Sequence, residues 1–265
     1  MSRQRTKKMA AALLLGTMCF FGGAPYALAA SKEGKVVIGL IIDDLGNQRD
    51  SGLEAVNLPG PLAYSILPHT PYGKMLAERA HEKNKEVMLH LPMESLHDNP
   101  LGKGGLKLEM TRSELQRAVR EDIDAIPHVI GINNHMGSLL TQQPKQMSWL
   151  MNELKERGGL FFIDSRTTER TVARLVAQEF NIPTHNRDVF LDHEQNPEAI
   201  RFQFQRLLSI ARKNGGGLGI GHPYPETLRI LREELVGAES KGFQLVPVRK
   251  IMEVKKAEQR ASYQN

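Results

Sequence analysis

Aspartate and histidine residues recur in this sequence directly after short apolar runs. Asp43 and Asp44 follow the run 36–42, and His90 ends the run 86–89. The same arrangement places a polar residue after an apolar run at His69, Asn134, His135, Asp164, Asp192 and His222. Imidazole nitrogens and carboxylate oxygens bind zinc and similar divalent ions, and the same groups serve as general acids and bases. The pattern predicts a metal-assisted hydrolytic site, provided that the fold brings these positions together.

The adjacent pair Asp43 and Asp44 is the most informative part of the pattern. Neighbouring residues on an extended chain point in different directions, so one carboxylate can bind a metal while the other accepts a proton from water. A single aspartate after a strand is often only a helix cap. Capping of the following segment is therefore the alternative role for Asp164 and for Asp192.

The elements that must position these residues alternate along the chain. Short β-branched or aromatic runs predict strands at 36–42, 62–67, 86–91, 129–133, 160–164, 189–192, 217–221 and 243–248. Apolar residues at helical spacing predict helices at 72–83, 111–126, 144–157, 169–180, 197–214 and 225–239. Most of the strands are too apolar to have a wet face, which is typical of buried parallel strands.

Alternation of this kind predicts seven or eight βα units in a single domain, forming a distorted or incomplete (β/α) barrel. A doubly wound open sheet is the alternative. In both architectures the carboxyl ends of the strands meet on one face, where active sites form. The Asp and His residues listed above should therefore share one mouth.

The amino-terminal segment predicts export. Four basic residues precede an apolar stretch without charges, and Ala27-Leu28-Ala29 offers a small-x-small cleavage site. We expect a signal peptide at 1–29, a barrel domain at 30–251 and a polar tail at 252–265, in a periplasmic or otherwise extracytoplasmic protein. An uncleaved membrane anchor is the alternative for the first segment, and no later run is long enough to span a bilayer.

Removal of the predicted signal peptide changes the charge balance. The whole chain has 35 basic and 30 acidic residues, but four of the basic residues and none of the acidic ones lie in the first 29 positions. The remainder is close to neutral, so we expect no nucleic-acid partner. The single cysteine, Cys19, also lies in the predicted signal peptide, which leaves the predicted mature chain without a disulfide.

Several segments resemble the motifs of the polysaccharide deacetylase family, most closely its divergent bacterial branch. The segment Ile41-Ile42-Asp43-Asp44-Leu45-Gly46 resembles the first motif, in which the first Asp is the base and the second a metal ligand. The segment from Ala80 to His90 resembles the helix and strand before the second motif, whose first His is a ligand. The resemblance extends from about Lys35 to about Val248 and implies a carbohydrate substrate and a divalent metal, with zinc the expected ion.

One departure affects the third ligand. The family places a second ligand His four residues after the first, where this chain has Glu94. His135, in the segment Asn133-Asn134-His135-Met136-Gly137, resembles a feature of the divergent branch and is the better candidate. The resemblance thus implies Asp44, His90 and His135 as ligands, with Glu94 as the alternative third ligand.

Two later segments complete the resemblance. The segment ending at Asp164 resembles the fourth motif, where an Asp tunes a His, and Gly219-Ile220-Gly221-His222-Pro223 resembles the fifth, where the His is the general acid. The implied roles are Asp43 as base and His222, oriented by Asp164, as acid. His69, Asn134 and Asp192 are expected to position the substrate or to support the site.

The resulting functional prediction is a metal-dependent hydrolase that removes N- or O-acyl groups from a carbohydrate of the cell envelope. Its alternative is a catalytically inactive deacetylase-like protein that binds glycan or a protein partner, since the usual second-motif His and the Arg-Pro segment of the third motif are missing. A metal-independent glycoside hydrolase with paired carboxylates fits less well, because the set of candidate residues is rich in histidine.

Overall fold

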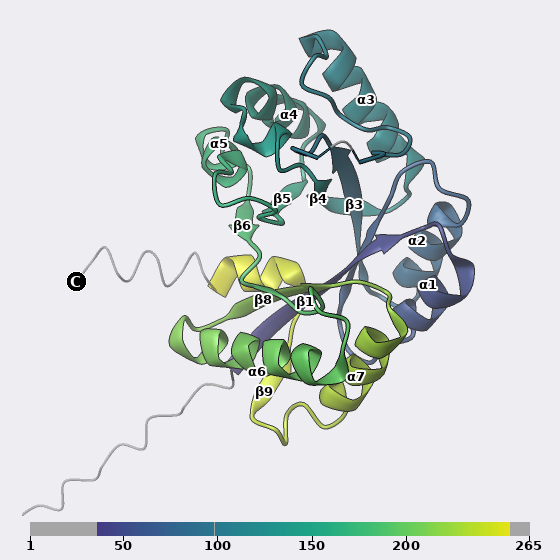
Figure 1. Cartoon of the computed structure of the whole chain (residues 1–265), viewed down its shortest axis with the longest axis vertical. Coiled ribbons are helices and arrows are strands. Elements are labelled where there is room, and N and C mark those ends of the chain that lie inside the picture. The colour runs from purple at the N-terminus through teal and green to yellow at the C-terminus, as the bar shows by residue number, and fades with distance from the viewer. Residues whose placement is uncertain (1–35, 98, 255–265) are drawn as a thin grey trace, which may run out of the picture. The chain divides into compact units, whose positions relative to one another are not determined.

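In the part of the chain that the structure describes, nine parallel strands form the framework of the fold (Figure 1). The structure is a computed structural model that describes residues 36–97 and 99–254, so the predicted signal peptide lies outside the described residues. The strands are β1 Val36–Leu45, β2 Ala63–Ile66, β3 Glu86–Met93, β4 Val129–Met136, β5 Phe161–Asp164, β6 Thr184–Asn186, β7 Val189–Phe190, β8 Gly217–Gly221 and β9 Phe243–Leu245. Their order in the sheet is β6-β5-β4-β3-β2-β1-β8-β7, with β9 beside the first residues of β1.

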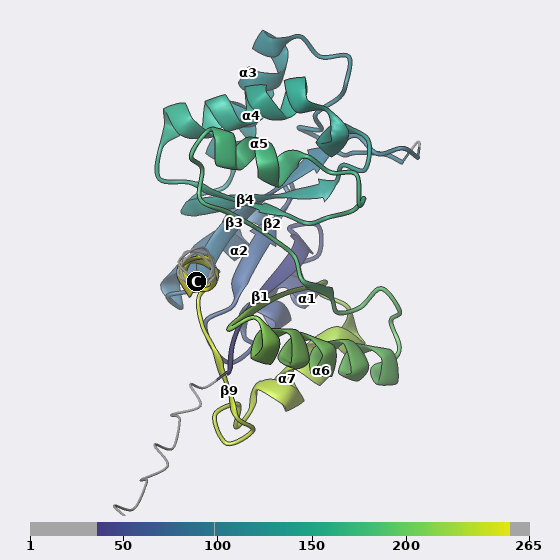
Figure 2. The same cartoon turned by 90° about the vertical axis from the view of Figure 1, so that its left-hand side faces the viewer.

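Helices lie between most of the strands and cover the outside of the curled sheet (Figures 1 and 2). They are α1 Arg49–Val56, α2 Gly73–Glu82, α3 Arg112–Ala125, the 3-10 turn η1 Leu140–Gln142, α4 Pro144–Arg157, α5 Ala173–Glu179, α6 Pro197–Lys213 and α7 Pro225–Leu235. Thr111 and Glu114 form the capping box expected at the start of α3. Proline occupies the first turn of α4, α6 and α7, where its missing N–H leaves no hydrogen bond unmade.

Two separate apolar clusters lie on the two faces of the sheet, because successive strand residues point to opposite sides. The larger cluster fills the layer between the sheet and the outer helices and includes Leu40, Leu89 and Phe162. The smaller one lies inside the curl and includes Ile41, Met88, Phe161, Ile220 and Ile251. The predicted distorted or incomplete (β/α) barrel is confirmed, and the doubly wound alternative is wrong.

A carboxyl-terminal helix packs against the inner face of the sheet. Residues 248–254 are helical, so the predicted strand 243–248 is shorter than expected and the predicted tail begins within a helix. Ile251 of this helix is fully buried and lies so close to Gly39 of β1 that a Cβ at Gly39 would come within 2.8 Å of it. Gly39 is thus a point of close approach between β1 and the helix.

The barrel has a seam between its two edge strands, β6 and β7. Only residues 187 and 188 separate these strands in the sequence. Arg187 donates its backbone N–H to the carbonyl of Asp164 on the β5 side, at 3.0 Å, and Asp188 donates to Leu218 on the β8 side, at 2.9 Å. The chain therefore steps from one edge of the sheet to the other within two residues.

Three named elements, α1, β6 and the single turn η1, were absent from the predicted set. Helix α1 has only eight residues and no side-chain cap, and β6 consists of Thr-His-Asn, which carries no apolar signal. Helix α5 begins four residues later than predicted, because Thr171 accepts a hydrogen bond from the N–H of Ala173 instead of entering the helix. Helix α7 ends at Leu235, four residues before the predicted end.

We predict that Ile251→Ala lowers the free energy of unfolding by about 2–5 kcal/mol, the usual cost of truncating a buried aliphatic side chain. Urea denaturation of the purified protein measures this. Leu175→Ala is the matched control, because Leu175 on α5 is 61 % exposed and should tolerate truncation. Equal stability of the two variants would show that the carboxyl-terminal helix does not close the barrel.

Candidate metal centre

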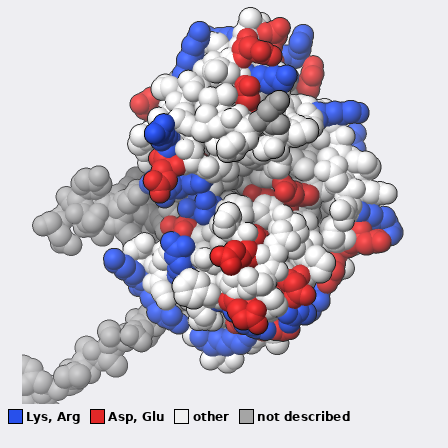
Figure 3. All heavy atoms as spheres, in the orientation of Figure 1, with Lys and Arg blue, Asp and Glu red and all other residues white. Residues whose placement is uncertain are grey.

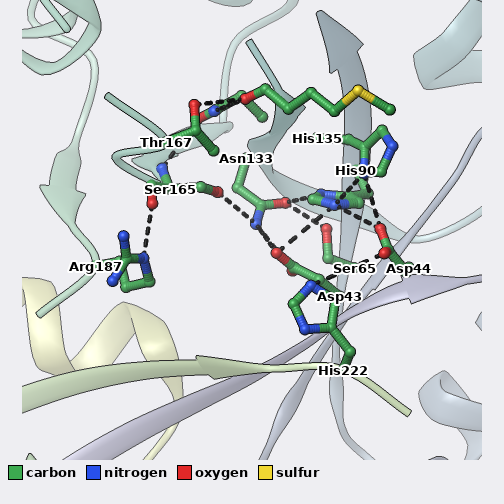
Figure 4. Close-up of polar contacts among 12 residues, drawn as sticks. Asp43, Asp44, Ser65, His90, Asn133, His135, Ser165, Thr167, Arg187 and His222 are labelled. Atoms are coloured by element: carbon green, nitrogen blue, oxygen red, sulfur yellow. Dashed lines mark hydrogen bonds and ion pairs between the residues drawn. The ribbon is translucent and has the colours of Figure 1, made fainter. Parts of the chain in front are cut away.

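The inner face of the sheet changes from apolar to polar toward the carboxyl ends of its strands. Inner residues alternate with outer ones, so the residue two positions after each member of the inner apolar cluster also faces inward. These next positions hold Asp43 after Ile41, Ser65 after Ala63, His90 after Met88, Ser165 after Ile163 and His222 after Ile220. Asn133 joins them, because β4 pairs with β3 so that Asn133 lies opposite His90. Figure 4 shows the resulting group.

Asp44 reaches the same group through a break in the strand. The pairing of β1 with β2 shifts between Ile42 and Leu45, and Asp44 has a φ of 59°. This left-handed conformation is tolerated by Asp better than by most residues. The irregularity allows two consecutive carboxylates to face one site, where a regular strand would direct them to opposite faces.

Asp44, His90 and His135 bring three potential ligand atoms together. Oδ1 of Asp44 lies 3.1 Å from Nε2 of His90 and 2.9 Å from Nδ1 of His135, and the two nitrogens lie 3.2 Å apart. A tetrahedral zinc site with bonds of about 2.0–2.1 Å separates its ligand atoms by about 3.3 Å. The three positions therefore fit a small divalent ion with little adjustment.

A second observation fits the same ion. Oδ1 of Asp44 is buried and accepts no well-aligned hydrogen bond, although two imidazole rings face it. A buried carboxylate oxygen without a donor is costly unless a cation compensates its charge. The donor set of one carboxylate and two imidazoles also suits zinc or a similar ion.

Asn133 connects the ligand group to Asp43. Its Nδ2 donates to both carboxylate oxygens of Asp43, at 2.9 and 3.0 Å, and its Oδ1 lies 2.9 Å from Nδ1 of His90. Because an amide oxygen only accepts, Nδ1 of His90 carries a proton, which leaves Nε2, facing Asp44 and His135, as the nitrogen that can bind a metal. Ser65 also donates to Oδ1 of Asn133. This network fixes the ring of His90 in the orientation that metal binding requires.

Charges at the site shift the pKa values of its members. Burial raises the pKa of Asp43 above its usual range, although the charges of His90 and His222 oppose the shift. Burial also favours a higher pKa for Asp44, but the facing imidazoles of His135 and His90 outweigh it and lower the pKa. The pKa of His90 is lowered by burial but raised more by the two carboxylates, to about 9 without an ion.

His222 is oriented by Asp192. Nδ1 of His222 lies 2.9 Å from Oδ1 of Asp192, and Oδ2 of Asp192 accepts the backbone N–H of His222 at 2.6 Å. Thr227 donates a further hydrogen bond to Oδ2 of Asp192. Burial lowers the pKa of His222, but the hydrogen bond and charge of Asp192 raise it above its usual value.

The prediction that Asp164 orients His222 is wrong. Asp164 accepts hydrogen bonds from the N–H of Arg166 and the hydroxyl of Thr171, both at 2.8 Å, and so caps the segment after β5. Strand β5 lies beside β6, across the seam from β8, whereas β7 pairs with β8 directly. The neighbour of His222 is therefore Asp192, which was predicted only as a supporting residue or a cap.

Three other predicted residues lie outside the ligand group. His69 pairs through Nε2 with Asp122 on α3, at 2.8 Å, instead of facing the ligands. The carboxylate of Glu94 accepts the backbone N–H of Leu108 at 2.6 Å, which assigns it to the loop before α3 and contradicts the alternative that it is the third ligand. Asn134 accepts the N–H of Ser165 at 2.9 Å and thereby joins the ends of β4 and β5.

Asn133, Ser65 and Ser165 were not among the predicted site residues. All three are buried, and Nδ2 of Asn133 lies 3.2 Å from Oγ of Ser165. Each stands two residues after an inward-facing position of its strand. The alternation of inward-facing and outward-facing residues would have predicted them, if it had been extended past the last apolar residue of each strand.

Comparison with known proteins agrees with this architecture. A sequence model of the divergent polysaccharide deacetylase family matches residues 40–252. The chain belongs to this family. The family match extends from β1 into the carboxyl-terminal helix, so it includes every member of the ligand group.

Two curated proteins are similar to the chain in sequence, and one solved structure has a similar fold. The uncharacterized protein YibQ of Escherichia coli strain K12 is 38 % identical over 196 residues, which are 74 % of this chain and 61 % of YibQ. An uncharacterized protein of Haemophilus influenzae Rd is 32 % identical over 215 residues, 81 % of this chain and 76 % of that protein. The crystal structure of the uncharacterized protein ATU2773 from Agrobacterium tumefaciens C58 has a TM-score of 0.77 at 20 % identity, and the match covers 81 % of this chain and 88 % of that one. The chain thus spans less than two thirds of YibQ.

Two further features concern the surface and the helices of this deacetylase-family chain. On the face drawn in Figure 3, acidic and basic side chains are interspersed without a continuous basic patch. Within residues 36–97 and 99–254, no helix is long and apolar enough to cross a membrane.

We predict that His135→Ala weakens binding of Zn²⁺ by more than about 100-fold, since the loss even of an outer partner commonly costs 10–100-fold. Glu94→Ala is the matched control and should retain the metal, because its carboxylate is bonded to Leu108. Elemental analysis and competition with a zinc chelator measure both variants. If the Glu94 variant lost the metal and the His135 variant retained it, Glu94 rather than His135 would be the third ligand.

Proposed function

We propose that the chain is a metal-dependent hydrolase that removes an N- or O-acyl group from a carbohydrate of the cell envelope. The observation that supports this most is the position of Asp43. It is a buried carboxylate with a raised pKa, directly next to the ligand group but outside it. A site that only held a structural ion would need no such carboxylate.

The divalent ion, expected to be zinc, would be held by Asp44, His90 and His135, and when bound it would polarise the acyl carbonyl and lower the pKa of water. Asp43 then acts as general base and takes the proton from the attacking water. Both oxygens of Asp43 already face Nδ2 of Asn133, so the carboxylate is held in one orientation. Its raised pKa makes it a better proton acceptor than an ordinary aspartate.

His222 acts as general acid. Its Nε2 lies 3.8 Å from Oδ2 of Asp44, so it faces the ligand group from the β8 side. The raised pKa keeps its proton available for the leaving nitrogen or oxygen. Water adds to the acyl carbon, the bond to the leaving atom breaks, and one proton passes to Asp43 while another leaves His222.

Export is part of the proposal. The sequence 1–29, with its basic start and Ala27-Leu28-Ala29, suits a cleaved signal peptide. A periplasmic or other extracytoplasmic location would give the enzyme access to envelope glycans.

A second candidate function is glycan binding without catalysis. The position four residues after His90 supplies no ligand, because Glu94 bonds to the loop before α3. The chain therefore departs from the usual second motif at this position, and a protein that has lost hydrolysis can keep a binding role on the same fold. The variants below separate the two functions.

We predict that Asp43→Asn retains zinc and lowers the rate of hydrolysis by about 10²–10⁴-fold, the usual contribution of a positioned general base. The measurements are elemental analysis and acetate release from N-acetylated chitooligosaccharides and peptidoglycan fragments. Asp44→Asn should instead lose zinc, because an amide is a poorer ligand than a carboxylate. Full activity of Asp43→Asn would reject the mechanism, and absence of activity in the wild type would favour the binding role.

We predict that Asp192→Asn lowers kcat by about 10–100-fold and moves the alkaline limb of the pH profile to lower pH. The reason is that the charge of Asp192 raises the pKa of His222, so its removal makes the acid lose its proton earlier. Asp164→Asn makes the same chemical change on the other side of the seam and should leave the alkaline limb in place. If only Asp164→Asn moved the alkaline limb, Asp164 rather than Asp192 would be the residue that orients His222.

A further inference from the structure

Two arginines beside the candidate site have no carboxylate partner. Arg166 follows β5 and Arg187 follows β6, and among the described residues neither forms an ion pair within 4.0 Å. Several arginines elsewhere on the surface pair with carboxylates, as seen at Arg79, Arg157, Arg201, Arg229 and Arg232, whereas others, such as Arg212, form no ion pair among the described residues. Neither guanidinium at the site is therefore neutralised by a direct ion pair, although Asp43 and Asp164 lie close enough to act on the charge of Arg187.

Arg187 is held in a fixed position. Its Nε donates to the carbonyl of Ser165 at 2.7 Å and its Nη2 to the carbonyl of Arg166 at 3.0 Å. The guanidinium also lies 4.6 Å from the ring centre of Phe190. Figure 4 shows it beside Ser165, at the edge of the group that contains Asp43 and Asn133. Both acceptors are neutral carbonyls, so they orient the guanidinium without compensating its charge.

The environment of Arg187 makes this charge costly. Burial and the neighbouring charge of Arg166 lower the pKa of Arg187 to about 10, although Asp43 and Asp164 oppose the shift. Asp43 already bonds to Asn133, and Asp164 to Arg166 N–H and Thr171. The guanidinium of Arg187 has five N–H donors, of which two are used in the hydrogen bonds to Ser165 and Arg166. The remaining N–H groups can bind an anion that compensates the charge.

A row of planar groups connects Arg187 to the catalytic residues. The ring centre of Phe190, which contacts Arg187, lies 5.1 Å from that of His222. The ring centre of Tyr224 lies 5.4 Å from that of His222. The two aromatic rings offer flat surfaces against which a sugar can pack. A sugar placed on this row would have its acyl group near His222 and another substituent near Arg187.

We propose that the preferred substrate is an acylated sugar that carries a carboxylate, and that Arg187, with Arg166, binds this carboxylate beside the scissile acyl group. The inference rests on the proposed function, whose substrate it specifies. A carboxylate suits the site, because the planar fork of a guanidinium matches its two oxygens. The fixed position of Arg187 also removes much of the entropic cost of forming that pair.

Equilibrium binding to the zinc-loaded protein tests the inference without requiring turnover. The probes are N,N′-diacetylchitobiose, the disaccharide GlcNAc–MurNAc, which adds a lactyl carboxylate, and the methyl ester of that disaccharide, which keeps the bulk but not the charge. We expect the acid to bind about tenfold more tightly than either neutral probe, as is usual for a charge-assisted pair. The preference should diminish at high salt.

Variants assign the preference to the two arginines. Arg187→Gln and Arg166→Gln should each reduce the preference for the acid while leaving the affinity for chitobiose within about twofold. Arg166 is exposed, so its variant remains informative if Arg187→Gln folds poorly. Arg212→Gln, an exposed position in the last turn of α6, removes the same charge elsewhere and should retain the full preference.

The outcomes separate this inference from the proposed function. Equal affinity for the three probes, or a preference that survives in both variants, overturns the inference even if acetate is released from neutral substrates. A preference lost in the two variants supports it. If the wild-type protein then hydrolyses none of the three probes, the hydrolase proposal fails while carboxylate recognition stands.

Discussion

The site depends on one interaction, the contact of the Asn133 amide with both Asp43 and His90. A carboxylate and an imidazole lie here in the interior of an apolar barrel, where an unsatisfied charged or polar group is expensive. One amide side chain meets both needs, because its nitrogen donates to the carboxylate and its oxygen faces the imidazole. The same contact determines which nitrogen of His90 faces the ligand group. The ligand geometry and the state of the candidate base therefore depend on one residue of β4.

The fold was largely predictable because its strands are buried on both faces. Runs such as Val36–Ile42 are apolar throughout, and parallel strands in a barrel need no wet face. The elements that were not predicted are those with few buried apolar residues. Strand β6 is Thr-His-Asn and helix α1 buries only Gly52, Ala55 and Val56, so neither carries an apolar period that could be recognised. These short elements are formed by their neighbours rather than by their own sequence preference.

The candidate site was predictable to the extent that it follows from strand ends and family resemblance. Asp44, His90 and His135 follow apolar runs, and the structure brings them together. The partner of His222 could not be found in this way, because Asp164 and Asp192 both end strands and only the order of strands in space distinguishes them. The role of Asp44 as a neighbour of Asp43 within one site also required a local irregularity. A pattern of alternating residues predicts regular strands and cannot reveal a shift in pairing.

The seam between β6 and β7 has a consequence for the width of the mouth. In a closed barrel the number and tilt of the strands determine the circumference. Here the circle is completed by Arg187 and Asp188 alone, which bond backward to β5 and forward to β8. Strands β4 and β8, which lead to Asn133 and His222, are joined on one side through β3, β2 and β1, and on the other side only through this short link and its flanking strands. An insertion at this point would therefore lengthen the link between the two edge strands without interrupting a helix or a strand.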